Sequence, residues 1–185
     1  SSRGLGDVYK RQKLIDYLQT LDDQQLDIIC EGFANMRLNV SGSAACPTEV
    51  FEEWRQLTGQ ALLERYGMTE IGMALSNPYR GERRPGYVGQ PLPDVSVQLV
   101  DDAGDVVTEE HIPGEIRIQS PTVFLEYWDN PKATAASFDE GWFCTGDIGV
   151  LEDGYFRIMG RSSVDIIKSG GYKLSALEIE NKLLA

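Results

Sequence analysis

A strand–helix–strand pattern between Asn39 and Glu70 constrains the fold of this chain more than any other feature. The first strand runs into a turn of small residues, and Pro47 then opens a helix that ends near Gly59. Ala61–Arg65 reads as the second strand. Two parallel strands joined through a helix end at the same edge of a sheet, where ligands bind in α/β folds. The pattern therefore predicts an α/β fold with a ligand site at this edge.

The turn after the second strand carries two polar side chains that suit phosphate chemistry. The hydroxyl of Thr69 can donate a hydrogen bond to a phosphate oxygen. The carboxylate of Glu70 can hold Mg²⁺ together with substrate phosphates. The two side chains together suit a phosphate with bound Mg²⁺.

Helices and short strands are expected on either side of this unit. Apolar spacing predicts helix from Leu14 to Ile29, in one or two pieces broken near Asp22. Beyond residue 85, alternating runs separated by Pro and Gly predict an antiparallel β region, as a small barrel or curved sheet. Asp101–Asp105 has the composition of a hairpin turn within this region.

Composition excludes several classes of protein. Residues 101–153 hold thirteen acidic residues against two basic ones, and the formal net charge of the chain is −12, which argues against nucleic acid as a partner. No apolar run reaches the roughly 20 residues of a membrane span. His111 is the only histidine and lies in an acidic loop, so no Ser-His-Asp triad is expected. P-loop and GxGxxG motifs are absent, so neither a P-loop NTPase nor a dinucleotide-binding fold is expected. Three widely spaced cysteines indicate free thiols in a reducing compartment.

Four segments in this order resemble the adenylate-forming superfamily of acyl-CoA synthetases, luciferases and peptide-synthetase adenylation domains. They are Ser41–Ala45, Tyr66–Glu70, Trp142–Asp147 and the stretch from Gly160 to Lys173. The resemblance runs from about residue 37 to the last residue. Within the superfamily, the chain is most similar to the malonyl-CoA synthetase branch of acyl-CoA synthetases.

The resemblance implies a nucleotide site in which Thr69 and Glu70 are catalytic and Glu70 is the metal ligand. The residues that would flank the adenine are Ser43, Ala44, Arg65, Tyr66 and Gly67. Asp147 would accept hydrogen bonds from the ribose hydroxyls, with Arg161 as a second ribose contact. Met68 would lie toward the acyl group. A malonyl substrate also needs a positive partner for its second carboxylate. The residues implied to bind nucleotide are Ser43, Ala44, Arg65, Tyr66, Gly67, Met68, Thr69, Asp147 and Arg161. The candidates for the second carboxylate come from composition alone and are Arg80, Arg83 and Arg84.

The activity implied is that of an acid–thiol ligase. It would activate a small carboxylic acid, with malonate as the leading candidate, as an acyl-AMP and transfer the acyl group to coenzyme A. The expected cofactors and partners are ATP, Mg²⁺ and coenzyme A, in the cytoplasm or mitochondria. The alternatives are another acyl- or aryl-CoA ligase, a peptide-synthetase adenylation domain, and a catalytically dead nucleotide-binding module. Oligomeric state is left open.

The resemblance also implies a division into domains. Residues 1–12 are predicted to be a non-native or poorly ordered tail, and residues 13–160 the later part of the large AMP-binding domain. Residues 161–185 would hold the hinge, at Ser163 or Asp165, and the start of the small C-terminal domain. There, Ser175 and Glu178 form a capping box for a helix that is expected to be cut short.

We therefore expect the 185-residue chain by itself to bind ATP weakly and not to turn over. The phosphate loop and the late catalytic lysine of the superfamily, which neutralise charge on the phosphates, are absent from it. Incubation with ATP, malonate and coenzyme A should release no AMP above background. AMP release near the rate of a full-length acyl-CoA synthetase would contradict this expectation.

Overall fold

The structure is a computed structural model that describes residues 5–43, 46–169, 172–176 and 179. The chain divides into two compact units, each continuous in space but not in sequence. The first unit contains residues 1–66 and 76–89, and the second contains residues 67–75 and 90–185.

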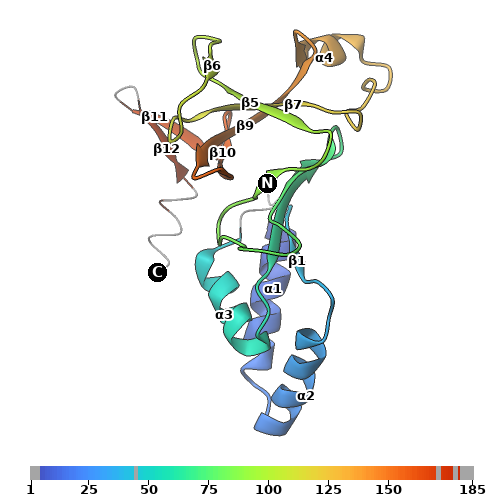
Figure 1. Cartoon of the computed structure of the whole chain (residues 1–185), viewed down its shortest axis with the longest axis vertical. Helices are drawn as coiled ribbons and strands as arrows, with labels where there is room; N and C mark the ends of the chain where they lie inside the picture. Colours follow the sequence, from blue (N-terminus) through green and yellow to red (C-terminus); the bar gives the residue numbers. More distant parts are fainter. Residues whose placement is uncertain (1–4, 44–45, 170–171, 177–178, 180–185) are drawn as a thin grey trace. The chain divides into compact units, whose positions relative to one another are not determined.

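Three helices form most of the first unit (Figure 1). They are α1 (Leu5–Leu18), α2 (Asp23–Ala34) and α3 (Thr48–Thr58). The predicted break near Asp22 is confirmed, because the Asp22 carboxylate accepts a hydrogen bond from Gln25 N at 2.9 Å and caps α2. The first helix begins at Leu5, so it includes part of the segment that the sequence set apart as a tail.

The core of the first unit lies where α3 packs against α1 and α2. Trp54 is fully buried at its centre, with the ring of Phe33 edge-on at 4.7 Å between centroids. The predicted boundaries of α3 are confirmed, since Pro47 precedes it and Gly59 ends it in a left-handed conformation with φ of 70°. The other buried members of this core are Ile15, Cys46, Val50, Phe51 and Leu62.

The parallel α/β unit predicted from the sequence is confirmed. Strand β1 (Val40–Ser41) pairs in parallel with β2 (Leu63–Met68), with Val40 opposite Leu63. The second strand starts and ends a few residues later than Ala61–Arg65. Two further strands, β3 (Gly72–Ser76) and β4 (Gln90–Pro91), complete the strand order β1-β2-β3-β4 and were not expected from the sequence.

The second unit is built on an antiparallel sheet with the strand order β10-β9-β7-β5-β6, and β8 is paired to β9 (Figure 1). Its apolar residues, including Ile116, Ile118 and Val150, are buried. The antiparallel region and the hairpin at Asp101–Asp105 are both confirmed. The elements are β5 (Ser96–Val100), β6 (Val106–Val107), β7 (Gly114–Gln119), α4 (Pro131–Ala136), β8 (Phe138–Asp139), β9 (Trp142–Glu152) and β10 (Tyr155–Arg161).

A separate two-stranded sheet follows β10. Strands β11 (Ile166–Ser169) and β12 (Tyr172–Ser175) pair in an antiparallel register. Most of the helix predicted after Ser175 lies outside the described residues, including Glu178 of its capping box.

The described residues also show the state of the cysteines and of the single histidine. Cys30, Cys46 and Cys144 are free thiols, as predicted. His111 is exposed, with 66% of its side chain accessible. Among the described residues, none of the helices is long and apolar enough to cross a membrane.

One buried charge stands out in the first unit. Glu64 on β2 is only 4% exposed, and its carboxylate accepts hydrogen bonds from the backbone N–H groups of Gly86, at 2.8 Å, and Cys46. Burial raises the pKa of Glu64 from 4.5 to about 7, although the two backbone donors act in the opposite direction. The side chain therefore ties two loops to the strand, one before α3 and one after β3.

The raised pKa of Glu64 predicts a pH dependence of stability. The folded state holds this proton to higher pH than the unfolded state, so the contribution to stability is complete below pH 4.5 and is lost as the pH rises through about 7. A rise in pKa from 4.5 to about 7, at about 1.4 kcal/mol per pKa unit, corresponds to a loss of at most roughly 3.5 kcal/mol. Glu64→Gln keeps the shape and removes the titration. The free energy of unfolding of wild type and variant would be measured by urea unfolding at pH 5 and pH 8. The value for wild type minus the value for the variant should be smaller at pH 8 than at pH 5. The same difference at both pH values would contradict the prediction.

Candidate functional site

The turn between β2 and β3 projects Thr69 and Glu70, as the sequence predicted. Ile71 N donates to Met68 O at 3.2 Å and closes the turn. A side chain at Gly67 would come within 2.1 Å of Gly72 O, so only glycine allows the two strands to approach this closely. Thr69 is exposed, so its hydroxyl is accessible to a ligand. Glu70 is half-buried, so its carboxylate can contact both the protein and a ligand.

A loop of residues 120–130 holds this turn from the same unit. Phe124 N donates to Glu70 O at 2.7 Å, and Thr122 Oγ1 donates to Ile71 O at 2.7 Å. The phenol of Tyr127 donates to Glu70 Oε1 at 3.0 Å. Both the backbone and the carboxylate of Glu70 are thus held by one loop.

Aromatic packing keeps this loop in place. The Phe124 ring lies edge-on to Tyr127 at 4.6 Å and to Phe143 at 5.5 Å, and stacks on Phe138 at 5.8 Å. Burial raises the pKa of Tyr127, and the hydrogen bond to Glu70 adds to the rise. A hydrogen bond with the Ser137 side chain and then the positive charge of Arg161 act on this pKa in the opposite direction.

Asp147 and Arg161 form the second pair that the sequence singled out. They lie opposite each other where β9 pairs with β10, and Arg161 Nε is 3.0 Å from Asp147 Oδ1. Asp147 is buried, with 6% of its surface accessible, whereas 57% of the Arg161 side chain is exposed. A buried carboxylate with an arginine at its rim can accept two neighbouring hydroxyl groups while the arginine balances its charge.

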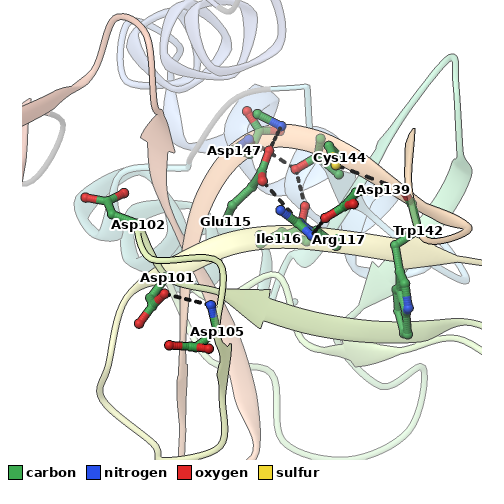
Figure 2. Close-up of polar contacts among 12 residues, drawn as sticks. Asp101, Asp102, Asp105, Glu115, Ile116, Arg117, Asp139, Trp142, Cys144 and Asp147 are labelled. Carbon is green, nitrogen blue, oxygen red and sulfur yellow. Dashed lines mark hydrogen bonds and ion pairs between the residues drawn. The ribbon is translucent and has the colours of Figure 1, made fainter. Parts of the chain in front are cut away.

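The backbone that carries Asp147 is shaped by the neighbouring strand β7 (Figure 2). Thr145 Oγ1 donates to Ile116 O at 2.7 Å and accepts from Asp147 N at 3.1 Å. Gly146 has a φ of +72°, and its N–H donates to Glu115 Oε1 at 3.1 Å. The register of β7 against β9 shifts beside this point, which is how the turn fits into a continuous strand.

Glu115 is itself held by an ion-pair chain. Arg117 Nε lies 3.3 Å from Glu115 Oε2, and the other end of the guanidinium pairs with Asp139 (Figure 2). Burial, and then the charge of Glu115, raise the pKa of the neighbouring Cys144 thiol, so it stays neutral and is a poor nucleophile. The cluster therefore shapes the backbone rather than supplying a reactive group.

The residues implied to contact adenine fall mainly in the first unit. Ser43 is exposed with a φ of 67°, and Ala44 lies outside the described residues. The guanidinium of Arg65 packs on Gly42, where a Cβ would come within 2.6 Å of it. Tyr66 follows and is half-buried. The structure thus brings Arg65 against the small-residue turn, as the motif order suggests.

The arginines considered for a second carboxylate differ in their surroundings. Arg83 donates to three backbone carbonyls, at 2.6 Å to Ala61, 2.9 Å to Tyr79 and 3.3 Å to Pro78. Arg84 Nε is 3.4 Å from Glu82, and Arg80 is exposed beside the Tyr79 ring. Arg83 therefore serves to hold its loop.

Tyr127 and Glu115 are the site residues that the sequence did not reveal. Tyr127 lies 57 positions from the carboxylate it contacts, and Glu115 lies 31 positions from the glycine it contacts. Neither belongs to a motif that was singled out. The strand pattern of residues 114–119 was the only local signal near either residue.

Comparison with known proteins gives consistent matches. The family model described as AMP-binding enzyme matches residues 11–128. The mitochondrial malonate–CoA ligase ACSF3 of Bos taurus is 50% identical, over 85% of this chain and 30% of the relative. The malonate–CoA ligase of Arabidopsis thaliana is 49% identical, over 98% and 29%. The chain spans about 30% of the length of these relatives.

A solved structure agrees with these matches. The ternary product complex of a malonyl-CoA ligase with methylmalonyl-CoA and AMP bound is 44% identical to this chain. It superposes with a TM-score of 0.74, over 94% of this chain and 36% of that structure. At this identity the agreement extends to sequence as well as fold.

The contact between Glu115 and Gly146 predicts a local change in dynamics. Glu115→Ala should accelerate hydrogen exchange at the Gly146 amide roughly ten- to hundredfold, because a hydrogen bond to a charged group contributes about 1.5–3 kcal/mol. Asp139→Asn is the matched control, since it weakens the outer ion pair of Arg117 and leaves the bond to Gly146 in place. Equal acceleration in both variants, measured by NMR, would assign the effect to the ion pairs instead.

Proposed function

Because this chain belongs to the family of AMP-binding enzymes, we propose that it is part of an acid–thiol ligase. The enzyme would activate a small carboxylic acid with ATP and pass the acyl group to coenzyme A, with malonate as the leading substrate. The observation that carries the proposal is the buried carboxylate of Asp147 paired with Arg161, in the same unit as the Thr69–Glu70 turn.

The proposed reaction has two steps. In the first, a carboxylate oxygen of the acid attacks the α-phosphorus of ATP, and the bond to pyrophosphate breaks. In the second, the sulfur of coenzyme A attacks the acyl carbon, the thiol proton is lost, and AMP leaves. Both steps place negative charge on phosphate oxygens, which must be balanced by donors and cations.

Three residues of the second unit have a proposed role in these two steps. The exposed hydroxyl of Thr69 would donate to a phosphate oxygen. Asp147 would accept the two ribose hydroxyls, and Arg161 would donate beside it in its rigid guanidinium geometry. The adenine contacts of Ser43, Ala44, Arg65 and Tyr66, and the acyl contact of Met68, remain predictions from the resemblance.

The residues present fit Mg²⁺ held together with the nucleotide. Among the described residues, none of the groups of three or more His, Cys, Asp or Glu could hold a metal ion alone. Mg²⁺ typically uses one or two carboxylates and completes its shell with water and substrate phosphates, which suits the single carboxylate of Glu70. Bound there, it would neutralise charge that develops on the phosphates.

Malonate is favoured as the acid by the names of the relatives. The relatives from Bos taurus and Arabidopsis thaliana are malonate–CoA ligases, and the solved relative holds methylmalonyl-CoA and AMP. A place in the cytoplasm or mitochondria belongs to the same proposal, since the Bos taurus relative is mitochondrial by name. Arg80 and Arg84 remain candidates for the second carboxylate of malonate.

The division into domains is also part of the proposal. Strands β11 and β12 form a sheet of their own directly after Arg161, which supports the start of a small C-terminal domain there. Asp165 Oδ2 accepts a hydrogen bond from Arg161 N at 2.8 Å. The junction therefore contacts one of the two residues proposed to bind the ribose. Rotation about such a junction is a common way to alternate between two reaction steps.

Removal of single charges tests the proposal in the full-length protein that contains this sequence. Asp147→Asn and Glu70→Gln should each lower kcat/KM for ATP roughly ten- to hundredfold, through lost charged hydrogen bonds and a lost metal ligand respectively. Glu126→Gln, which removes an exposed charge from the loop of residues 120–130, is the control. Activity would be followed as pyrophosphate release with malonate, acetate, a medium-chain acid and benzoate. A preference for another acid would reject malonate, and unchanged ATP kinetics in both variants would reject the site.

A further inference from the structure

The hydroxyl of Tyr127 contacts the proposed metal ligand without belonging to any motif of the nucleotide site. We propose that Tyr127 is a positioning residue that orients the Glu70 carboxylate toward the Mg²⁺–nucleotide. The inference rests on the proposed function, because it needs Glu70 to act as the metal ligand. It adds a residue from a different part of the chain to the phosphate end of the site.

The contact is made to one oxygen of the carboxylate. Tyr127 donates from its phenol to Glu70 Oε1 at 3.0 Å. Among the described residues, this is the hydrogen bond that the structure gives the Glu70 carboxylate, so the second oxygen is available to a cation. Donation to one oxygen restrains the rotation of the carboxylate and leaves the other oxygen for the cation.

The same loop holds Glu70 at a second point. Phe124 N donates to Glu70 O at 2.7 Å, three residues before the tyrosine. With its backbone and its side-chain end both held, Glu70 has little freedom to rotate about its side-chain bonds. A glutamate on an open turn would otherwise lose that freedom each time it bound a cation. Prior ordering therefore favours binding.

Tyr127 is itself ordered before any ligand arrives. Its backbone N–H donates to Thr134 Oγ1 at 3.0 Å, and its ring lies edge-on to Phe124. By contrast, Leu125 and Trp128 in the same loop are 93% and 94% exposed. Tyr127 is therefore held against the carboxylate while these neighbouring side chains remain in solvent.

The phenol hydroxyl is separable from the packing of the ring. The contacts with Phe124 are made by the ring, whereas the contact with Glu70 is made by the oxygen. Carboxylates that bind metals are commonly held by such hydrogen bonds, and the loss of one costs roughly 10- to 100-fold in metal affinity or activity. Tyr127→Phe removes the oxygen, with its hydrogen bonds to Glu70 and Ser137, and keeps the ring.

The test uses the full-length protein that contains this sequence, with Mn²⁺ in place of Mg²⁺ so that binding can be followed by EPR. We expect Tyr127→Phe to weaken binding of Mn²⁺ in the presence of ATP roughly tenfold or more. The KM for malonate and for coenzyme A should stay within about twofold, because neither contacts the metal carboxylate. Tyr17→Phe, which removes an exposed hydroxyl from α1, is the matched control.

Glu70→Gln measured in parallel separates two kinds of failure. If Glu70→Gln weakens Mn²⁺ binding and Tyr127→Phe does not, the positioning role is overturned and the proposed metal role of Glu70 stands. If neither variant affects Mn²⁺ binding, the metal role fails and the inference fails with it.

If Tyr127→Phe also lowers thermal stability, the double variant Glu70→Gln with Tyr127→Phe still decides between the two outcomes. A residue that acts through Glu70 should add little further loss of Mn²⁺ binding once Glu70 is replaced. A double variant whose loss equals the product of the two single losses would show that Tyr127 acts elsewhere, and would overturn the proposal.

Discussion

The hydrogen bond from Phe124 N to Glu70 O is the interaction on which the proposed phosphate end depends. A turn between two strands is an exposed and mobile place for a ligand, and its side chains have no fixed direction by themselves. The bond ties this turn to a loop that is anchored by aromatic packing of Phe124 against Phe138 and Phe143. The direction of Glu70 is therefore set by the packed part of the second unit rather than by the turn.

The ribose end follows the same construction. Asp147 lies on the long strand β9. The regular pleat of a strand would not by itself direct this carboxylate toward a ligand. Thr145 and Glu115 bond the backbone around Gly146 and hold it in a left-handed conformation that interrupts the pleat. In both places a carboxylate that is proposed to bind a ligand is held by a partner from a distant segment.

This construction explains what could be predicted from the sequence. The capped end of α3 at Gly59 and the hairpin at Asp101–Asp105 depend on neighbouring residues, so local patterns were sufficient. The parallel strands could be predicted because a helix between two strands implies parallel pairing. The motifs around Glu70 and Asp147 were visible for the same reason. Tyr127 and Glu115 were not, because their partners are 57 and 31 positions away and their own segments carry no motif.

The pairing of carboxylates also bears on how an acidic chain could bind a polyphosphate. With a formal net charge of −12, unpaired acids near the site would repel the nucleotide. Asp147 faces Arg161 at 3.0 Å, and Glu115 faces Arg117 at 3.3 Å. Glu70 has a neutral donor instead, which orients the carboxylate but leaves its charge in place. That remaining charge is suited to a divalent cation that arrives with the phosphates. Of these three acids, Glu70 is the one to which the described part of the chain gives no basic partner, and it is the one proposed to bind metal.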